Sequence, residues 1–147
     1  MNKVYKKVFD FAKKYPGGVT WRIKSHAKVV EEYINPDEKV IYAFGAQKNE
    51  KFSEIFNTFV VVLTSNRILL GHKRLFWGSF LYSITPDLYN DLQIYNGLLW
   101  GKITIDTVKE KIVLSNLPKK GLDEIETTIS EFMMEAKQKY KNEKEAI

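Results

Sequence analysis

From Lys39 onward the chain consists of short segments rich in β-branched and aromatic residues, with no helical period between them until residue 122. The spacing predicts seven strands, at residues 40–47, 55–64, 67–73, 79–85, 91–96, 102–108 and 111–116. Turn residues separate these segments, and we expect Asn66 to take a positive φ in the tight turn between the second and third strands. Consecutive strands without crossover helices pair antiparallel, so the sequence predicts an antiparallel meander.

One long amphipathic helix is predicted after the last strand. Its apolar stripe consists of Leu122, Ile125, Ile129, Phe132, Met133, Ala136 and Tyr140. Acidic residues occupy its first turn and lysines its end, which is the order that the helix dipole favours. We expect Ile129 and Phe132 to be buried where this helix covers one open end of the sheet, and we expect the helix to fray after Tyr140.

Two shorter amphipathic helices are predicted before the strands, one ending at Pro16-Gly17-Gly18 and one spanning residues 20–34. The apolar arc of the first helix consists of Val4, Tyr5, Val8, Phe11 and Tyr15. Burying these side chains would contribute on the order of 10 kcal/mol, more than the lysines of this helix could gain at an anionic surface. We therefore expect this helix to pack against the domain or a second subunit. The predicted division is a basic helical extension at residues 1–36 and a domain at residues 37–147.

The order of these elements and three local sequences resemble the pleckstrin-homology (PH) fold, and in particular the bacterial YokE-like PH domains. The three sequences are Asn35-Pro36-Asp37-Glu38-Lys39-Val40, Leu63-Thr64-Ser65-Asn66-Arg67-Ile68-Leu69 and Gly97-Leu98-Leu99-Trp100-Gly101-Lys102-Ile103-Thr104-Ile105. The resemblance covers residues 37–140 and implies an α+β fold, a PH-like β-roll of seven antiparallel strands capped by a C-terminal helix, here with two N-terminal helices added. It implies a non-enzymatic binding or assembly module, without implying a particular ligand.

No recognised catalytic motif occurs in this sequence. The 147 residues include no cysteine and two histidines, and His26 falls on the apolar arc of the second helix. The segment from Gly97 to Ile103 is one residue too short between its glycines for a phosphate-binding P-loop, and it precedes a predicted strand instead of a helix. We therefore expect no enzymatic activity, no metal ion and no cofactor, and we expect both histidines to be packed or solvated.

The sequence also bears on the cellular compartment. The N-terminus shows no apolar core of a signal peptide, because lysines interrupt each apolar stretch. The longest aliphatic and aromatic run, Phe59 to Leu63, is far shorter than the ~20 residues that span a bilayer. Together with the lack of cysteine, these features predict a cytoplasmic protein, with attachment at the membrane periphery as the alternative.

The net charge of +5 is concentrated in residues 1–34, which carry eight basic and three acidic side chains. The most suggestive surface is the connection between the third and fourth strands, which combines basic and aromatic residues. We expect it at the same end of the roll as the connection between the first and second strands. The candidate residues for contacting a partner or an anion are Lys48, Lys51, Lys73, Arg74, Phe76, Trp77, Lys6 and Lys13. We expect either Phe76 or Trp77 to pack inward.

Two functions are consistent with these residues. The leading hypothesis is protein–protein interaction or self-association in the cytosol, through the helical extension or a sheet edge. The alternative is peripheral binding to an anionic membrane through the lysine-rich first helix and the connection between the third and fourth strands. Nucleic-acid binding would rest on a pI near 9.2 alone, because no recognised nucleic-acid-binding motif accompanies it.

Overall fold

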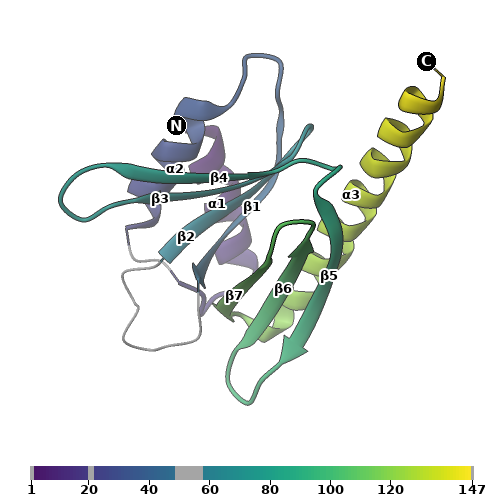
Figure 1. The fold of residues 1–147 in the computed structure, drawn as a ribbon. Coiled ribbons are helices and arrows are strands. Elements are labelled where there is room, and N and C mark those ends of the chain that lie inside the picture. The colour runs from purple at the N-terminus through teal and green to yellow at the C-terminus, as the bar shows by residue number, and fades with distance from the viewer. Residues whose placement is uncertain (1, 20–21, 49–57, 147) are drawn as a thin grey trace.

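The computed structural model describes residues 2–19, 22–48 and 58–146, and Figure 1 shows how its helices and strands are arranged. The elements are α1 (Lys3–Lys14), α2 (Ile23–Tyr33), β1 (Val40–Lys48), β2 (Thr58–Thr64), β3 (Ile68–Lys73), β4 (Ser79–Ile84), β5 (Tyr89–Asn96), β6 (Gly101–Thr107), β7 (Lys111–Leu117), η2 (Lys119–Gly121) and α3 (Leu122–Glu145). The predicted order of helices and strands is confirmed, and η2 is an additional short 3-10 helix. Residues 55–57 of the second predicted strand lie outside the described residues.

The strands form one seven-stranded antiparallel sheet in the order β4-β3-β2-β1-β7-β6-β5. Strands β1 to β4 form one meander and β5 to β7 another, so the predicted antiparallel pairing is confirmed. The two meanders join where Gln47 and Lys48 of β1 pair with Ser115 and Leu114 of β7. Because this join is short, the two halves of the sheet turn sharply against each other (Figure 1).

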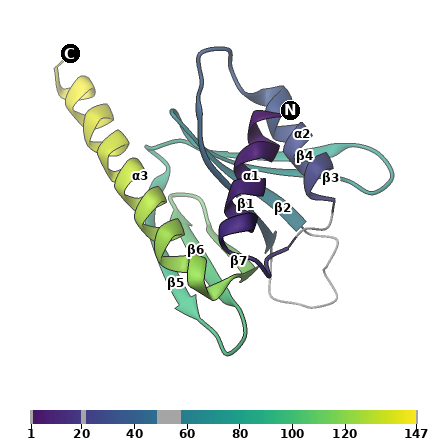
Figure 2. The same ribbon diagram turned by 180° about the vertical axis from the view of Figure 1, so that it is seen from behind.

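The main hydrophobic core lies between the two halves of the sheet and the first part of α3. α3 packs against β5 and β6, and Figure 2 shows it lying alongside this half of the sheet. The buried residues of α3 are Leu122, Ile125, Ile129 and Met133. The predicted burial of Ile129 is confirmed, whereas Phe132 is only partly buried at the edge of the core. Met133, four residues after Ile129 on the same helix face, takes the central position instead.

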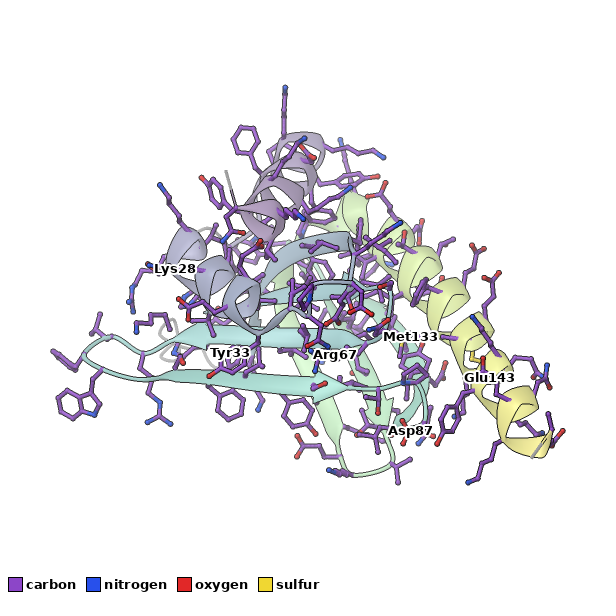
Figure 3. All side chains as sticks on the ribbon, turned by 90° about the horizontal axis from the view of Figure 1, so that it is seen from above. Lys28, Tyr33, Arg67, Asp87, Met133 and Glu143 are labelled. Atoms are coloured by element: carbon purple, nitrogen blue, oxygen red, sulfur yellow. The ribbon has the colours of Figure 1, made fainter. Side chains whose placement is uncertain are left out.

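α3 continues as a regular helix to Glu145, so the predicted fraying after Tyr140 is wrong. Residues 136–145 are mostly Ala, Lys, Gln and Glu, whose intrinsic preference sustains a helix without a buried face. Met133 is the last buried residue of α3, and Figure 3 shows Glu143 on the part of the helix that extends past the sheet. The apolar stripe therefore continues beyond the core, and Tyr140 is exposed.

A second core lies on the opposite face of the β1–β4 meander, beneath α1 and α2. Its members are Val4, Val8, Ile23, Ala27, Val30, Ala43, Val60, Val62 and Leu69. Successive residues of β2 alternate between the two cores, because side chains along a strand point to opposite faces. Every residue of β2 is consequently buried. The expectation that α1 packs by its apolar arc is confirmed.

The turn between β2 and β3 is stabilised by a side chain and does not need a positive φ. Thr64 Oγ1 accepts hydrogen bonds from the backbone N–H groups of Asn66 and Arg67, each at 3.1 Å. The non-glycine residues with positive φ in the described chain are Arg22 and Asn116, so the prediction for Asn66 is wrong. A hydroxyl that closes the turn locally removes the need for a left-handed backbone at Asn66.

Two of the sequences that resemble the PH family meet at the buried side chain of Glu38. Arg67 contacts both carboxylate oxygens, with Nε 3.0 Å from Oε2 and Nη2 3.1 Å from Oε1. Arg67 Nη2 also donates to the carbonyl oxygen of Tyr33 at 3.2 Å, and Figure 3 shows Arg67 beside the end of α2. Burial opposes ionisation of Glu38, but hydrogen bonds from Arg67 and Thr64 outweigh it and hold the pKa of Glu38 below its ordinary value.

Candidate functional site

The β3–β4 connection carries three consecutive apolar side chains that face solvent. Leu75, Phe76 and Trp77 are 50%, 85% and 80% exposed. The expectation that Phe76 or Trp77 packs inward is therefore wrong. The connection is closed by the Arg74 N–H, which donates to the carbonyl oxygen of Gly78 at 3.0 Å. In Figure 1 the β3–β4 hairpin extends past the helices that cover the sheet, which is consistent with the high exposure of Phe76 and Trp77.

The base of this connection is attached to α2 and the residue that precedes it. Arg22 donates from Nη1 to the Lys73 carbonyl oxygen at 3.1 Å and from Nη2 to the Arg74 carbonyl oxygen at 3.4 Å. His26 Nδ1 accepts a hydrogen bond from the Lys73 N–H at 2.7 Å. These bonds fix the backbone of two candidate basic residues, so the exposed rings are presented on a braced hairpin.

Lys48 lies at the same end of the sheet as this hairpin, as the sequence predicts. Its Nζ is 6.0 Å from the ring centroid of Phe59 and 5.8 Å from that of Phe80. These distances are typical of cation–π contacts. The two rings themselves meet edge to face, with 6.0 Å between centroids. Lys51, the other candidate in the β1–β2 connection, lies outside the described residues.

Lys6 and Lys13 lie on the exposed arc of α1, whose opposite arc is packed. α1 contacts β1 and α2, whereas Lys73 and Arg74 lie at the end of β3 and in the connection that follows it. The seven candidate residues that the structure describes are therefore not one surface. One group surrounds the β3–β4 connection, and the α1 lysines form another.

His26 is a buried residue whose ring stacks on that of His72, with 4.8 Å between ring centroids. Burial, with smaller contributions from His72 and Arg22, lowers the pKa of His26 from 6.5 to about 4. The ring is therefore neutral at pH 7, which suits Nδ1 as a hydrogen-bond acceptor. His26 is thus a packed histidine, as the sequence predicts.

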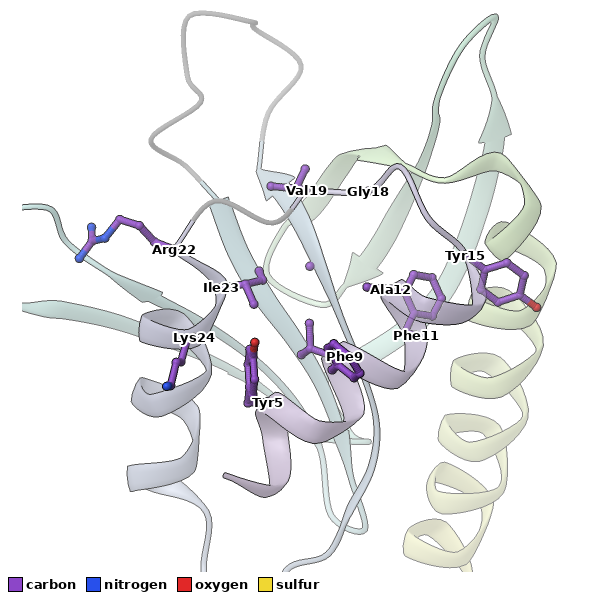
Figure 4. Close-up of a pocket in the computed structure, with 12 residues that line it drawn as sticks. Tyr5, Phe9, Phe11, Ala12, Tyr15, Gly18, Val19, Arg22, Ile23 and Lys24 are labelled. Carbon is purple, nitrogen blue, oxygen red and sulfur yellow. The ribbon is translucent and has the colours of Figure 1, made fainter. Parts of the chain in front are cut away.

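A hollow of about 320 Å³ lies between α1, α2 and β1. Its lining is mostly apolar and consists of Tyr5, Val8, Phe9, Phe11, Ala12, Tyr15, Gly18, Val19, Arg22, Ile23, Lys24 and Gly45. Figure 4 shows Tyr5, Phe9 and Ile23 around the hollow, with the Arg22 side chain extending away from it. The described lining residues include no carboxylate, and no group of three or more His, Cys, Asp or Glu in the described chain is placed to hold a metal ion.

Comparison with known proteins identifies the family. A family model described as a bacterial PH domain matches residues 34–131, which is two thirds of the chain. This chain belongs to the bacterial PH-domain family. One similar solved structure is the pleckstrin homology domain from Shewanella amazonensis SB2B, with 15% identity over 85% of this chain and 98% of that chain, and a TM-score of 0.49.

A second similar structure is a DUF1696 family protein with a PH domain from Shewanella loihica PV-4. The two chains are 14% identical. The match covers 78% of this chain and 92% of that chain, with a TM-score of 0.48. No curated protein matches the sequence.

The PH-domain match begins at residue 34, directly after α2. Both N-terminal helices nevertheless cover one face of the PH sheet through the second core. The division of the chain at residue 36 stays a prediction. In the described ranges, no helix is long and apolar enough to cross a membrane.

The β5–β6 connection of this PH domain is a second exposed apolar tip, which the sequence analysis did not identify as a surface. Leu98, Leu99 and Trp100 are 93%, 69% and 49% exposed. The Gly97 N–H donates to the Trp100 carbonyl oxygen at 3.0 Å, and Gly101 then begins β6. A strand follows these glycines, so the rejection of a P-loop is confirmed. In the sequence, the exposed tip could have been recognised from its three apolar residues between Gly97 and Gly101, a run too short to form a strand of its own.

Proposed function

We propose that this PH domain is a non-enzymatic protein-binding module of the cytosol, whose docking surface is the β3–β4 connection and the adjoining edge of β4. The observation that carries the proposal is the exposure of Phe76 and Trp77 at the end of a braced hairpin. Their ring centroids are 6.3 Å apart, so the two rings form one apolar surface. Large aromatic side chains supply much of the binding free energy at protein interfaces.

The edge of the sheet next to these rings is suited to pairing with another strand. β4 stands at one end of the strand order, and Ser79–Ile84 contains no charged residue and no proline. Proteins commonly protect exposed edges with such residues, because an unprotected edge pairs readily with another chain. A partner strand added to β4 would be held by main-chain hydrogen bonds, with Phe76 and Trp77 contacting its side chains at one end.

The charges around the rings indicate the chemistry of the partner. Lys73 and Arg74 precede the apolar residues, and Lys48 lies at the same end of the sheet. We therefore expect an extended segment with acidic and apolar residues. A second copy of this chain is the simplest alternative partner, because two β4 strands could pair antiparallel about a twofold axis.

Membrane binding through α1 has less support. A helix that binds a membrane surface inserts its apolar arc into the bilayer. Val4, Val8 and Phe11 of α1 are instead buried within the protein. Lys6 and Lys13 would then offer a salt-sensitive attraction without apolar insertion.

Self-association can be tested by sedimentation equilibrium at several protein concentrations. The native protein is compared with a Phe76→Ser/Trp77→Ser double variant and with Phe9→Ser, which removes another exposed aromatic side chain from α1. If a second copy is the partner, the native protein and Phe9→Ser should associate reversibly and the double variant should remain monomeric.

If the native protein is monomeric, the same three proteins serve to find a different partner. Proteins retained from a cell lysate by the native protein and Phe9→Ser, but not by the double variant, would be identified, purified and titrated by calorimetry. A purified partner whose affinity depends on Phe76 and Trp77 supports the proposal. The lack of both self-association and any such partner contradicts it.

A further inference from the structure

The β5–β6 tip, defined as residues 98–100, lies between two shallow hollows. One is lined by the tip together with Lys102 and Asn116. The other is lined by Leu99 and Trp100 together with residues that follow α1 and precede α3, including Lys119 and Lys120. In Figures 1 and 2 the β5–β6 connection is the lowest part of the ribbon, close to the first turn of α3. The tip therefore projects from the body of the protein.

The charged side chains that line the two hollows are all lysines. Lys102 lines the first, and Lys14, Lys119 and Lys120 line the second, with no Asp or Glu among the described lining residues of either. Lys14 is paired with Glu124 at the start of α3. Lys119 and Lys120 are both exposed. The surroundings of the tip are consequently positive, which favours an anionic ligand surface.

The exposure of the apolar side chains decreases from the apex of the tip to its base. Leu98 at the apex is the most exposed, followed by Leu99 and then Trp100 at the base. Tyr95 on β5 stands beside the base, and Lys102 Nζ lies 4.8 Å from the centroid of its ring. In a membrane interface, aliphatic side chains enter the acyl region, aromatic rings lie at the headgroups and lysines contact anionic phosphates. The order of residues along the tip matches this profile.

We propose that the β5–β6 tip inserts into the surface of a bilayer that contains anionic phospholipids. Leu98 and Leu99 enter the acyl boundary, while Lys119 and Lys120 lie against the headgroup phosphates. A bilayer deforms around a projecting apex, whereas a protein would need a cavity shaped to receive it with acidic groups on both sides. The tip points in a different direction from the β3–β4 connection (Figure 1), so this site is independent of the proposed protein-docking surface.

Vesicle co-sedimentation tests this site directly. The probes are vesicles of phosphatidylcholine alone and of an equimolar mixture of phosphatidylglycerol and phosphatidylcholine. We expect the native protein to partition at least about tenfold more strongly onto the anionic vesicles, with an affinity that falls as NaCl is raised. Leu98→Ser/Leu99→Ser should weaken partition by more than about tenfold, because the inserted apolar area is lost. Lys119→Gln/Lys120→Gln should weaken it by about thirtyfold.

Two matched variants separate this site from the other exposed surfaces. Lys6→Gln/Lys7→Gln removes the same number of charges from α1, and Phe76→Ser/Trp77→Ser removes the other apolar tip. At a protein concentration where sedimentation shows the native protein to be monomeric, both should partition nearly as the native protein does, and circular dichroism would verify that every variant is folded. The proposal is overturned if the native protein binds neither vesicle, or binds both equally. It is also overturned if the β5–β6 variants bind as the native protein does, and binding lost in the Phe76→Ser/Trp77→Ser variant would place the membrane contact at the β3–β4 connection.

Discussion

Arg67 holds both carboxylate oxygens of Glu38, and this ion pair joins the end of α2 and the start of β1 to the β2–β3 turn. The Glu38 side chain is fully buried, whereas that of Arg67 is 21% exposed. Water can partly solvate the charge of Arg67, whereas the buried charge of Glu38 is compensated only by groups of the protein, Arg67 first among them. Arg67 is thus the residue whose removal tests the role of this contact in the fold.

We expect Arg67→Met to lower the free energy of unfolding by about 3–5 kcal/mol, because it leaves the charge of Glu38 buried without its partner. Urea titration at pH 7 would measure the change. Lys39→Met removes an exposed cation nearby and should change the free energy of unfolding by less than about 0.5 kcal/mol. Equal losses in the two variants would show that the ion pair does not hold these segments together.

Gly71 allows α2 to approach β3 closely, because a Cβ atom at this position would overlap the side chain of Val30. We expect Gly71→Ala to lower the free energy of unfolding by about 1–3 kcal/mol through overpacking. Val30→Ala removes the overlapping methyl groups, so the double variant should lose less than the sum of the two single variants. Strictly additive losses, measured by urea titration, would contradict this account of Gly71.

The helices and strands could be predicted because apolar periodicity is a local property of the sequence. The exposure of Phe76 and Trp77 could not be predicted in this way, because it depends on how far the helices extend along the sheet in the folded protein. The backbone of Asn66 was mispredicted because the hydroxyl of Thr64 closes the turn. The lysines around the β5–β6 tip come from separate segments of the sequence. Lys102 and Lys119 lie on either side of the tip only once the chain has folded, so the sequence alone did not reveal this surface.

Acidification should destabilise the protein before its carboxylates titrate. The pKa of His26 is lowered to about 4 in the folded state, so between pH 6.5 and about 4 the unfolded state binds a proton that the folded state does not. Stability is therefore fully present above pH 6.5 and is lost as pH falls, by about 3 kcal/mol in total. Urea titrations from pH 7.5 to pH 5 would measure the first part of this loss.

The control for this titration is His26→Asn, whose side-chain oxygen can replace Nδ1 as acceptor for the Lys73 N–H. His72 and Arg22, the charged or titratable groups that influence His26, remain in this variant. Its stability should be nearly independent of pH between 7.5 and 5. A loss as steep as that of the native protein would assign the effect to another group.

The role of α3 in covering the main core can be tested at two positions on this helix. Ile129 is buried in the main core and Glu131 is exposed. We expect Ile129→Ala to lower the free energy of unfolding by about 2–5 kcal/mol and Glu131→Ala to leave it nearly unchanged. Both substitutions introduce the same helix former, so helix propensity is matched. Similar melting temperatures for the two variants would mean that α3 does not close the core.

Amide hydrogen exchange, read by mass spectrometry, most directly tests the central claim that the β3–β4 connection and the edge of β4 bind a protein. The native protein would be measured alone at low concentration and with its partner bound, either a second copy at high concentration or the purified partner. The account predicts slower exchange in peptides that cover residues 74–84, and no such slowing in the Phe76→Ser/Trp77→Ser variant. Protection confined to α1 or to other segments, with residues 74–84 unchanged, would contradict it.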